Sequence, residues 1–213
     1  MRPARALTNQ TLAEAAQGLA ARHEEFSFVL TKYGPPPMWG RKPGFTTLVH
    51  IILEQQVSLV SARSMFDRLR QNILPFTPER FLELGDLHLR SLGVTRQKSA
   101  YFLSLAEAAA TGQLAHVSRL ADDDARAELM RIKGIGPWTA DIYLLMVLKR
   151  PDIWPNGDIA LATAVMNLMK FASRPTFPQL ANMAEVWRPF RSVAARMLWQ
   201  YYLGERRTKG SSG

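Results

Sequence analysis

The sequence of 213 residues contains no cysteine. This absence excludes disulfides, cysteine-ligated zinc and iron–sulfur clusters. Histidines are few as well, and no two of them have the spacing of a metal-ligand pair. They are His23, His50, His88 and His116. We therefore expect a protein that requires no metal and no cofactor.

Long apolar runs are missing too. No segment approaches the roughly 18 consecutive apolar residues of a membrane span, and the first ten residues, MRPARALTNQ, lack the apolar core of a secretory signal. With 47% hydrophobic and 21% charged residues, the composition is that of a globular protein with one sizeable core or two small lobes. We expect a cytoplasmic protein, associated with the nucleoid if the source is bacterial.

Acidic residues are fewer than basic residues. Lys and Arg number 27 against 18 Asp and Glu, which gives a net charge of +9. From Ala125 onward the counts are 13 against 6, so this half carries +7 of the surplus. The partner is therefore expected to be anionic, with nucleic acid as the first candidate and an anionic membrane surface as the second. A membrane role is disfavoured because the basic residues do not line one face of an exposed amphipathic helix.

Convincing strand patterns are absent, whereas helix-start signals recur along the chain. Thr11 and Glu14 form a capping-box pattern that predicts a helix running to about Tyr33. Further N-caps are predicted at Ser58, Thr77, Thr95 and Thr176. With no internal repeat and no linker, the sequence predicts about ten helices.

One stretch, from Leu129 to Asp158, combines a helical hairpin with a single carboxylate. Gly134 and Gly136 form a tight Gly-x-Gly turn, and Pro137 is suited to the first turn of the following helix. That helix points its free N–H groups and positive dipole end toward the turn, which predicts a site for one phosphate beside Lys133. The alternative is a tight turn between helices with no ligand.

Asp158 follows Pro155-Asn-Gly157 and precedes an apolar helix predicted from Ile159 to Met169. Its simplest interpretation is an N-cap, which also fixes a carboxylate in place. Asp141 and Asp152 are weaker candidates for a catalytic carboxylate, the latter in a loop where we expect it to be solvated.

Four segments together resemble a known family. IKGIGPWTADIYLL, WPNGDIAL, LVHIILEQQVS near residue 50 and WRPFRSVAARMLW near residue 190 occur in this chain. They are similar to the helix-hairpin-helix DNA glycosylase superfamily, above all to its alkylation-repair branch, the 3-methyladenine DNA glycosylase II type. The resemblance implies an all-α, two-lobed fold with a helix-hairpin-helix motif and a central DNA-binding cleft. It predicts a central lobe of about residues 45–160, containing the hairpin 129–148, a second lobe of about 1–44 plus 161–205, and a flexible tail from 206 to 213.

The resemblance also implies a reaction. Asp158 stands at the family's catalytic aspartate, where it stabilises an oxocarbenium-like sugar or activates water. Members that also cut the backbone carry a lysine at the position of Trp138, so a monofunctional enzyme that leaves an abasic site is expected. Its partner is damaged double-stranded DNA, from which it flips and removes alkylated purines. A monomer with no obligate protein partner is expected.

A base pocket is predicted from aromatic residues, because alkylated purines are cationic and aromatic faces attract cations. The candidates are Trp138, Trp199 and Trp154. Ile142 and Ile159 stand where well-studied relatives carry tyrosines, which implies a less aromatic pocket. For Trp199, on the apolar face of the last helix, core packing is an equal alternative.

The remaining assignments concern DNA contacts. Gln56, with Gln55 on the same face, is predicted to wedge into the duplex. Backbone carbonyls in the hairpin turn are implied as ligands of a monovalent cation. Phosphate contacts are predicted at Lys133, Gly134, Gly136, Thr139, Arg96 and Lys98, and cation ligands at the carbonyls of Met130, Ile132 and Ile135. For Arg96 and Lys98 the alternative is ordinary solvated charge at a helix start. Trp39 lies in a loop among cations, where a buried tryptophan in a solvated loop is favoured over the lip of a nucleic-acid cleft.

Two other functions remain open from the sequence. One is a non-catalytic helix-hairpin-helix module that only binds DNA. The other is a glycosylase for oxidised or deaminated bases, which only a substrate panel separates from the alkylpurine enzyme.

Overall fold

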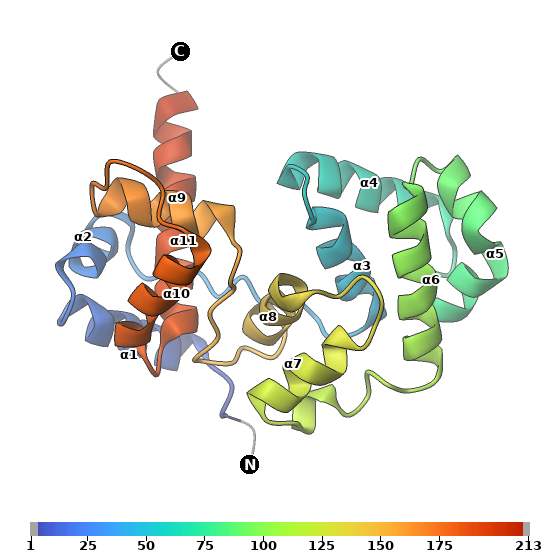
Figure 1. The fold of residues 1–213 in the computed structure, drawn as a ribbon, viewed down its shortest axis with the longest axis horizontal. Coiled ribbons are helices and arrows are strands. Elements are labelled where there is room, and N and C mark those ends of the chain that lie inside the picture. Colours follow the sequence, from blue (N-terminus) through green and yellow to red (C-terminus); the bar gives the residue numbers. More distant parts are fainter. Residues whose placement is uncertain (1–3, 211–213) are drawn as a thin grey trace. The chain divides into compact units, whose positions relative to one another are not determined.

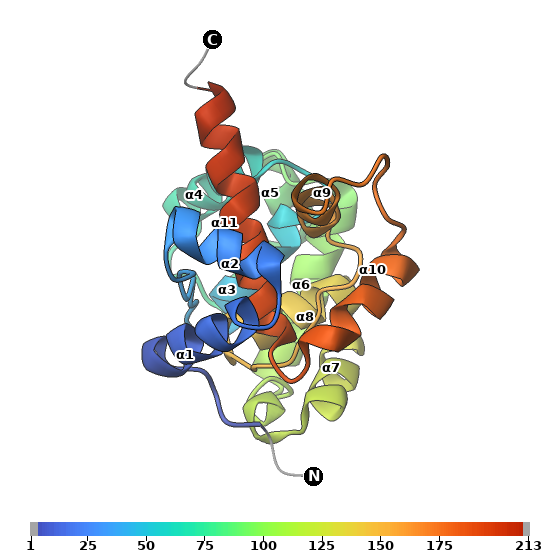
Figure 2. The same cartoon turned by 90° about the vertical axis from the view of Figure 1, so that its left-hand side faces the viewer.

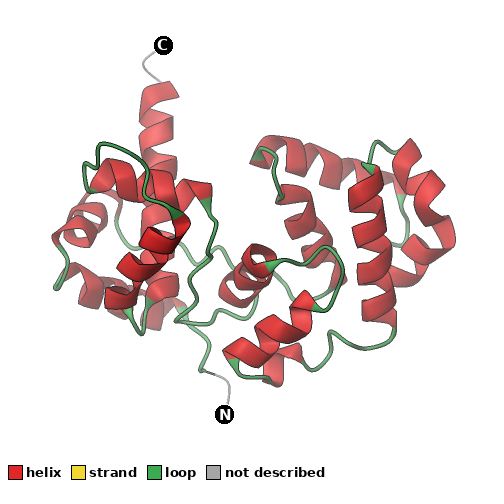
Figure 3. Ribbon diagram, viewed as in Figure 1, coloured by secondary structure: helices red, strands yellow, loops and turns green. Residues whose placement is uncertain are grey.

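A computed structural model describes residues 4–210, with side chains as far as residue 208. Its ordered elements are all helical, with eleven α-helices and two short 3-10 helices. Within residues 4–210 there is no strand (Figure 3). The all-α class predicted from the sequence is confirmed.

The described chain divides into two compact units. Unit 1 is Arg41–Leu148, and unit 2 combines Ala4–Gly40 with the chain from Lys149 onward. The boundary expected near residue 160 therefore falls at Leu148, so residues 149–160, including Asp158, belong to unit 2.

Unit 1 contains the hairpin and a cluster of phenylalanine rings. Phe81 is at the centre of its core, with the rings of Phe45 and Phe76 each 4.9 Å away and that of Phe102 at 6.1 Å. Its α-helices are α3 Phe45–Glu54, α4 Leu59–Asn72, α5 Pro78–Ser91, α6 Arg96–Ala110, α7 Asp122–Met130 and α8 Pro137–Met146 (Figure 1). Helix α8 is buried from Thr139 to Leu145 without interruption. A helix that is apolar on all sides belongs in a core, so the hairpin is anchored by its second helix.

Unit 2 is arranged around its last helix, α11 Arg191–Gly210, which packs against α1, α2 and α9 (Figure 2). The other α-helices of unit 2 are α1 Asn9–Ala20, α2 Glu24–Tyr33, α9 Ile159–Leu168 and α10 Phe177–Ala184. The buried ring of Trp187 lies 5.2 Å from that of Phe26 and 5.4 Å from that of Trp154. These large rings supply much of the apolar area that unit 2 buries.

The N-terminal helix differs from the prediction. Two helices, α1 and α2, replace the single helix expected up to Tyr33, and a break at residues 21–23 separates them. The capping box joins Thr8 and Thr11 rather than Thr11 and Glu14. Since Thr8 already satisfies the amide of Thr11, the helix begins three residues earlier than the Thr-x-x-Glu pattern indicates.

The expected tail also differs. Helix α11 continues through residues 206–210, and residues 211–213 lie outside the described part of the chain. Within that part, no helix combines the length and apolar character that crossing a membrane requires.

Candidate functional site

The hairpin turn of unit 1 connects α7 to α8 and is closed from inside by two isoleucines. Ile132 and Ile135 are buried, and the amide of Ile135 donates to the carbonyl of Ile132 at 3.0 Å. Gly134 has a φ of +95°, and a Cβ placed there would lie 2.3 Å from Cγ of Tyr101. Any larger residue at 134 would be strained and would collide with α6. The turn therefore requires glycine at this position on two independent grounds.

The outer face of the turn is open at the start of α8. Gly136 is the N-cap, so no side chain occupies the cap position, and Pro137 follows as the first helical residue. Lys133, Gly136 and Pro137 are exposed. A helix start with an open cap and a neighbouring ammonium group attracts anions. This geometry is suited to one phosphate group.

Gln55 lies differently from the expectation that it shares the wedge with Gln56. Its side-chain amide donates to the carbonyl of Gly134 at 2.9 Å and to Oγ1 of Thr139 at 2.8 Å. Gln55 thereby fastens the end of α3 to the hairpin turn. The Thr139 hydroxyl is buried beneath this contact, whereas Gln56 is exposed with a left-handed φ of 58°.

Lys98 also lies differently from the expectation of a phosphate contact. Its Nζ donates to the carbonyls of Leu53 at 2.8 Å and of Gln55 at 3.1 Å, and burial lowers the pKa of its ammonium group. The ammonium therefore caps the C-terminal end of α3. Arg96, two residues earlier, is exposed at the start of α6, where contact with phosphate stays a prediction.

Asp158 is the N-cap of α9 in unit 2. Its Oδ1 accepts the backbone N–H of Leu161 at 2.9 Å and the indole N–H of Trp199 at 3.3 Å. The residue is only 7% exposed. The capping role read from the sequence is confirmed, and the structure adds the indole of Trp199 as a second donor. A carboxylate held by two N–H groups has a defined orientation.

The two rival carboxylates are engaged elsewhere. Asp141 is buried and accepts Nε of Arg126 at 2.7 Å. Asp152, expected to be solvated, instead forms ion pairs with Arg188 at 2.6 Å and with Arg191 at 2.9 Å. Both carboxylates are therefore parts of ion pairs within their own units.

Two of the tryptophan candidates, Trp154 and Trp199, are both buried in unit 2, as the core-packing alternative for Trp199 expected. Trp154 is buried against Trp187, so the structure places it in the core of unit 2. Trp199 contacts Asp158 as described, and the ring of Trp39 lies 6.5 Å from it in an edge-on arrangement. Trp39 is half-buried with a φ of 44°, a left-handed conformation that is strained for a bulky residue. Sequence reasoning favoured burial of Trp39 and missed this pairing, for which the only sequence signal was an aromatic among cations.

The remaining pocket candidates have contrasting environments. Trp138 is half-buried at the start of α8. Ile142 is buried within unit 1, whereas Ile159 is 60% exposed at the start of α9. Ile142 thus packs in the core, and Ile159 is available for contact with a ligand.

The turn is also compatible with the monovalent cation implied by the family resemblance. The carbonyl of Ile132 accepts the amide of Ile135. Within residues 4–210, no turn or loop amide donates to the carbonyl of Met130 or to that of Ile135. Carbonyl oxygens are suitable ligands for such an ion. Among the described side chains, no group of three or more His, Asp or Glu gathers as a metal site.

Comparison with known proteins agrees with this arrangement. Residues 49–189, more than half of the chain, match the HhH-GPD superfamily of base excision DNA repair proteins. DNA-3-methyladenine glycosylase 1 of Schizosaccharomyces pombe is 27% identical over 201 residues, covering 91% of this chain and 88% of that protein. The DNA-3-methyladenine glycosylase of Bacillus subtilis is 29% identical over 170 residues, 73% of this chain. This chain spans only 56% of the length of that Bacillus protein.

A solved structure is similar as well. The DNA-3-methyladenine glycosidase of Bacillus halodurans has a TM-score of 0.74 at 26% identity, covering 88% of both chains. The chain belongs to the HhH-GPD superfamily of base excision DNA repair proteins. The resemblance to the alkylation-repair branch, inferred from the sequence, is confirmed by the names of these relatives.

Proposed function

We propose that this protein is a monofunctional DNA glycosylase that removes alkylated purines, such as 3-methyladenine and 7-methylguanine, from damaged duplex DNA. One observation carries the proposal. The buried carboxylate of Asp158 is oriented at the start of α9 by the amide of Leu161 and the indole of Trp199. The relatives named as DNA-3-methyladenine glycosylases support the choice of substrate.

The proposed reaction is hydrolysis of the N-glycosidic bond. The bonding electron pair leaves with the base, and positive charge develops on the sugar. A fixed carboxylate stabilises that charge or accepts a proton from the attacking water. The water oxygen then bonds to the anomeric carbon, and the products are a free base and an abasic site. Because Asp158 is already oriented, little reorganisation is needed as the charge forms.

Base recognition is assigned first to Trp199, which contacts Asp158, and to Trp39, which packs against Trp199. Trp199 and Trp39 form an edge-on pair, and an alkylated purine carries a positive charge. The face of an indole attracts such a cation by about 0.5–2 kcal/mol. Trp138 and the exposed Ile159 remain proposed base contacts.

DNA binding is assigned to unit 1. The open start of α8 with Lys133 is proposed to hold one phosphate, and exposed Gln56 to fill the space left by the flipped base. Trp138 stands where lyase members of the family carry their lysine, so no Schiff base and no strand cleavage are expected. The protein is proposed to act as a monomer.

The decisive experiment is release of free base from methylated duplex DNA by the wild type and by Asp158→Asn. The proposal expects 3-methyladenine or 7-methylguanine from the wild type, and DNA binding without release from the variant. Strand scission should appear only after alkali treatment. If the wild type binds DNA but frees neither base, the alkylpurine assignment is wrong, and oxidised and deaminated substrates then separate another glycosylase from a non-catalytic clamp.

A further inference from the structure

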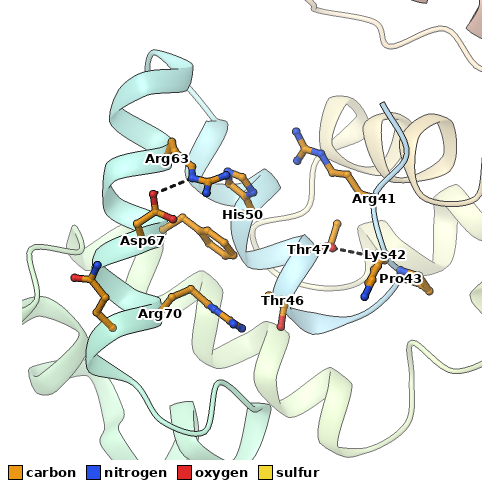
Figure 4. A pocket seen from close by; sticks show the side chains of 11 residues that line it. Arg41, Lys42, Pro43, Thr46, Thr47, His50, Arg63, Asp67 and Arg70 are labelled. Carbon is orange, nitrogen blue, oxygen red and sulfur yellow. Dashed lines mark hydrogen bonds and ion pairs between the residues drawn. The ribbon is translucent and has the colours of Figure 1, made fainter. Parts of the chain in front are cut away.

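A large basic groove lies in unit 1, separate from the hairpin turn. It has a volume of about 1080 Å³ and lies between the segment that precedes α3, α3 itself and the side of α4 that faces α3 (Figure 4). The residues that matter for its chemistry are Arg41, Lys42, His50, Arg63, Phe66 and Arg70. Nothing in the proposed excision reaction uses any of them.

The charge of the groove is positive. Arg41 is paired with Glu54 through two hydrogen bonds of 3.0 and 2.7 Å, and Arg63 contacts Asp67 at 2.8 Å. Lys42 and Arg70 add two further cations, so four positive groups face two carboxylates. The Arg63–Asp67 pair is well exposed, with 68% of the arginine side chain accessible. Exposed ion pairs contribute at most about 1 kcal/mol, so Arg63 can exchange this partner for a phosphate.

Two aromatic contacts lie at the groove, one of them beneath an arginine. The imidazole of His50 stacks on the ring of Phe66 at 4.3 Å with an interplanar angle of 10°. Arg70 lies over the ring of Phe76, 5.3 Å from its centroid. Burial lowers the pKa of His50, which favours the neutral imidazole in this stack. The groove therefore presents cations along its sides and flat apolar surface beneath them.

The position of the groove relates it to DNA. Glu54, the partner of Arg41, is the last residue of α3, and the Gln55–Gln56 loop follows directly. From Arg63 to Arg70 the groove then follows α4 for seven residues, which is about 10 Å at 1.5 Å per residue. At about 3.4 Å per nucleotide of one strand, this length corresponds to about three nucleotides.

We propose that this groove binds the phosphate backbone of a DNA strand that continues past the Gln56 loop. It is a second DNA contact surface of unit 1, distinct from the single phosphate site at the hairpin. The inference rests on the DNA binding included in the proposed function and does not depend on base excision.

The first test is the salt dependence of binding to undamaged duplex DNA, which requires no base release. The double variant Arg63→Gln/Arg70→Gln should bind more weakly at low salt. Its slope of log affinity against log salt should be smaller by about 1.8, since each lost phosphate contact removes about 0.9. Arg90→Gln is the matched control, because Arg90 forms a comparable surface pair with Asp86 in the same unit. An unchanged slope in the double variant would overturn the proposal.

The second test uses the absence of cysteine in this chain. Gln71→Cys introduces one thiol beside the groove and leaves its arginines intact, whereas Glu83→Cys places a control thiol on α5. Duplexes carrying a thiol tether on a single backbone phosphate should form a disulfide with Gln71→Cys at one or two neighbouring positions, and not with Glu83→Cys. Equal cross-linking of both variants, or of neither, contradicts the groove assignment. If the wild type releases no base but Gln71→Cys cross-links as expected, the excision proposal is wrong and the groove assignment stands.

Discussion

Two helices of this chain, α8 in unit 1 and α9 in unit 2, begin just after a glycine-containing turn but are capped in opposite ways. Helix α8 has Gly136 at its N-cap and therefore no capping side chain. Helix α9 has Asp158 there, whose carboxylate accepts the amide of Leu161. Both starts present the positive end of a helix dipole. One leaves this end available to an external anion, and the other supplies an anion of its own.

The packing explains why the two starts can differ. Helix α8 is buried along Thr139–Leu145, so tertiary contacts stabilise it without a side-chain cap. Helix α9 begins with the exposed Ile159, and its first turn depends more on Asp158. An open cap is thus tolerated where the helix is buried, and there it is free to serve binding. A closed cap orients a carboxylate that is then available for chemistry.

The largest effect is expected from Asp158→Asn. Asparagine is as good an N-cap as aspartate, so the free energy of unfolding should change by only a few tenths of a kcal/mol. Loss of the negative charge should slow base release by about 10²–10³-fold, the range for removing one preorganised electrostatic group. Single-turnover base release and thermal unfolding measured on the same samples separate the two roles.

The control for that prediction is Asp158→Ala, which loses both the cap and the charge. It should be about 1 kcal/mol less stable than Asp158→Asn and equally slow. If Asp158→Asn keeps the wild-type rate, Asp158 is an N-cap only.

The next largest effect is expected at the hairpin turn. Gly134→Ala combines a left-handed backbone with a Cβ 2.3 Å from Tyr101, and should destabilise unit 1 by about 2–4 kcal/mol. Gly136→Ala is the matched control, because its φ is −90° and no atom lies within 4 Å of the point that a Cβ would occupy there. Chemical denaturation should show a clearly larger shift for Gly134→Ala than for Gly136→Ala, where alanine at the N-cap costs about 1 kcal/mol or less. Equal shifts for both variants would mean that the turn does not require glycine at 134.

A third variant gives α8 an aspartate N-cap like the one that α9 has. Gly136→Asp gives α8 a carboxylate cap, which should leave stability unchanged or raise it by a few tenths of a kcal/mol. The added charge occupies the place proposed for a phosphate and should weaken DNA binding about tenfold, a loss of about 1.4 kcal/mol. Gly136→Asn, which caps without charge, should keep more of the affinity. Undiminished binding by Gly136→Asp would rule out a phosphate at this helix start.

The smallest effect is expected from the contact that holds the turn in place. Gln55→Ala removes two hydrogen bonds to Gly134 and Thr139 and should cost about 1–2 kcal/mol of stability. Gln56→Ala removes an exposed side chain and should leave stability within about 0.5 kcal/mol of the wild type while weakening binding to lesion DNA. Thermal unfolding distinguishes the pair. The reverse order of stabilities would mean that Gln56, not Gln55, supports the hairpin.

Much of the helical layout could be predicted because its signals are local. Ser58, Thr77, Thr95, Thr176 and Asp158 cap the helices predicted from them, each through an amide three residues ahead. A cap needs only its own segment, so sequence is sufficient to identify it. The failure at the first helix has the same origin, since Thr8 and Thr11 offer competing local caps.

The side-chain environments were less predictable. Lys98 resembled a phosphate ligand from its helix-start position, but it binds carbonyls at the end of α3, more than forty residues away in sequence. Trp154 resembled a pocket residue and packs in the core, whereas Trp39 resembled a core residue and lies beside Trp199. Such partners are distant in sequence, and no local pattern encodes them.

The sequence by itself determined the helices, the glycine turn, the basic surplus and the family, because capping, backbone freedom and charge are properties of short segments. The tertiary structure decided which neighbours each charged and aromatic side chain contacts. It placed Asp158 against the indole of Trp199, and it paired Asp141 and Asp152 with arginines. Folding also bonded Gln55 to the carbonyl of Gly134 and left Gln56 exposed. It brought cations from two segments together in one groove. The physical reason is that availability depends on partners brought close only by folding.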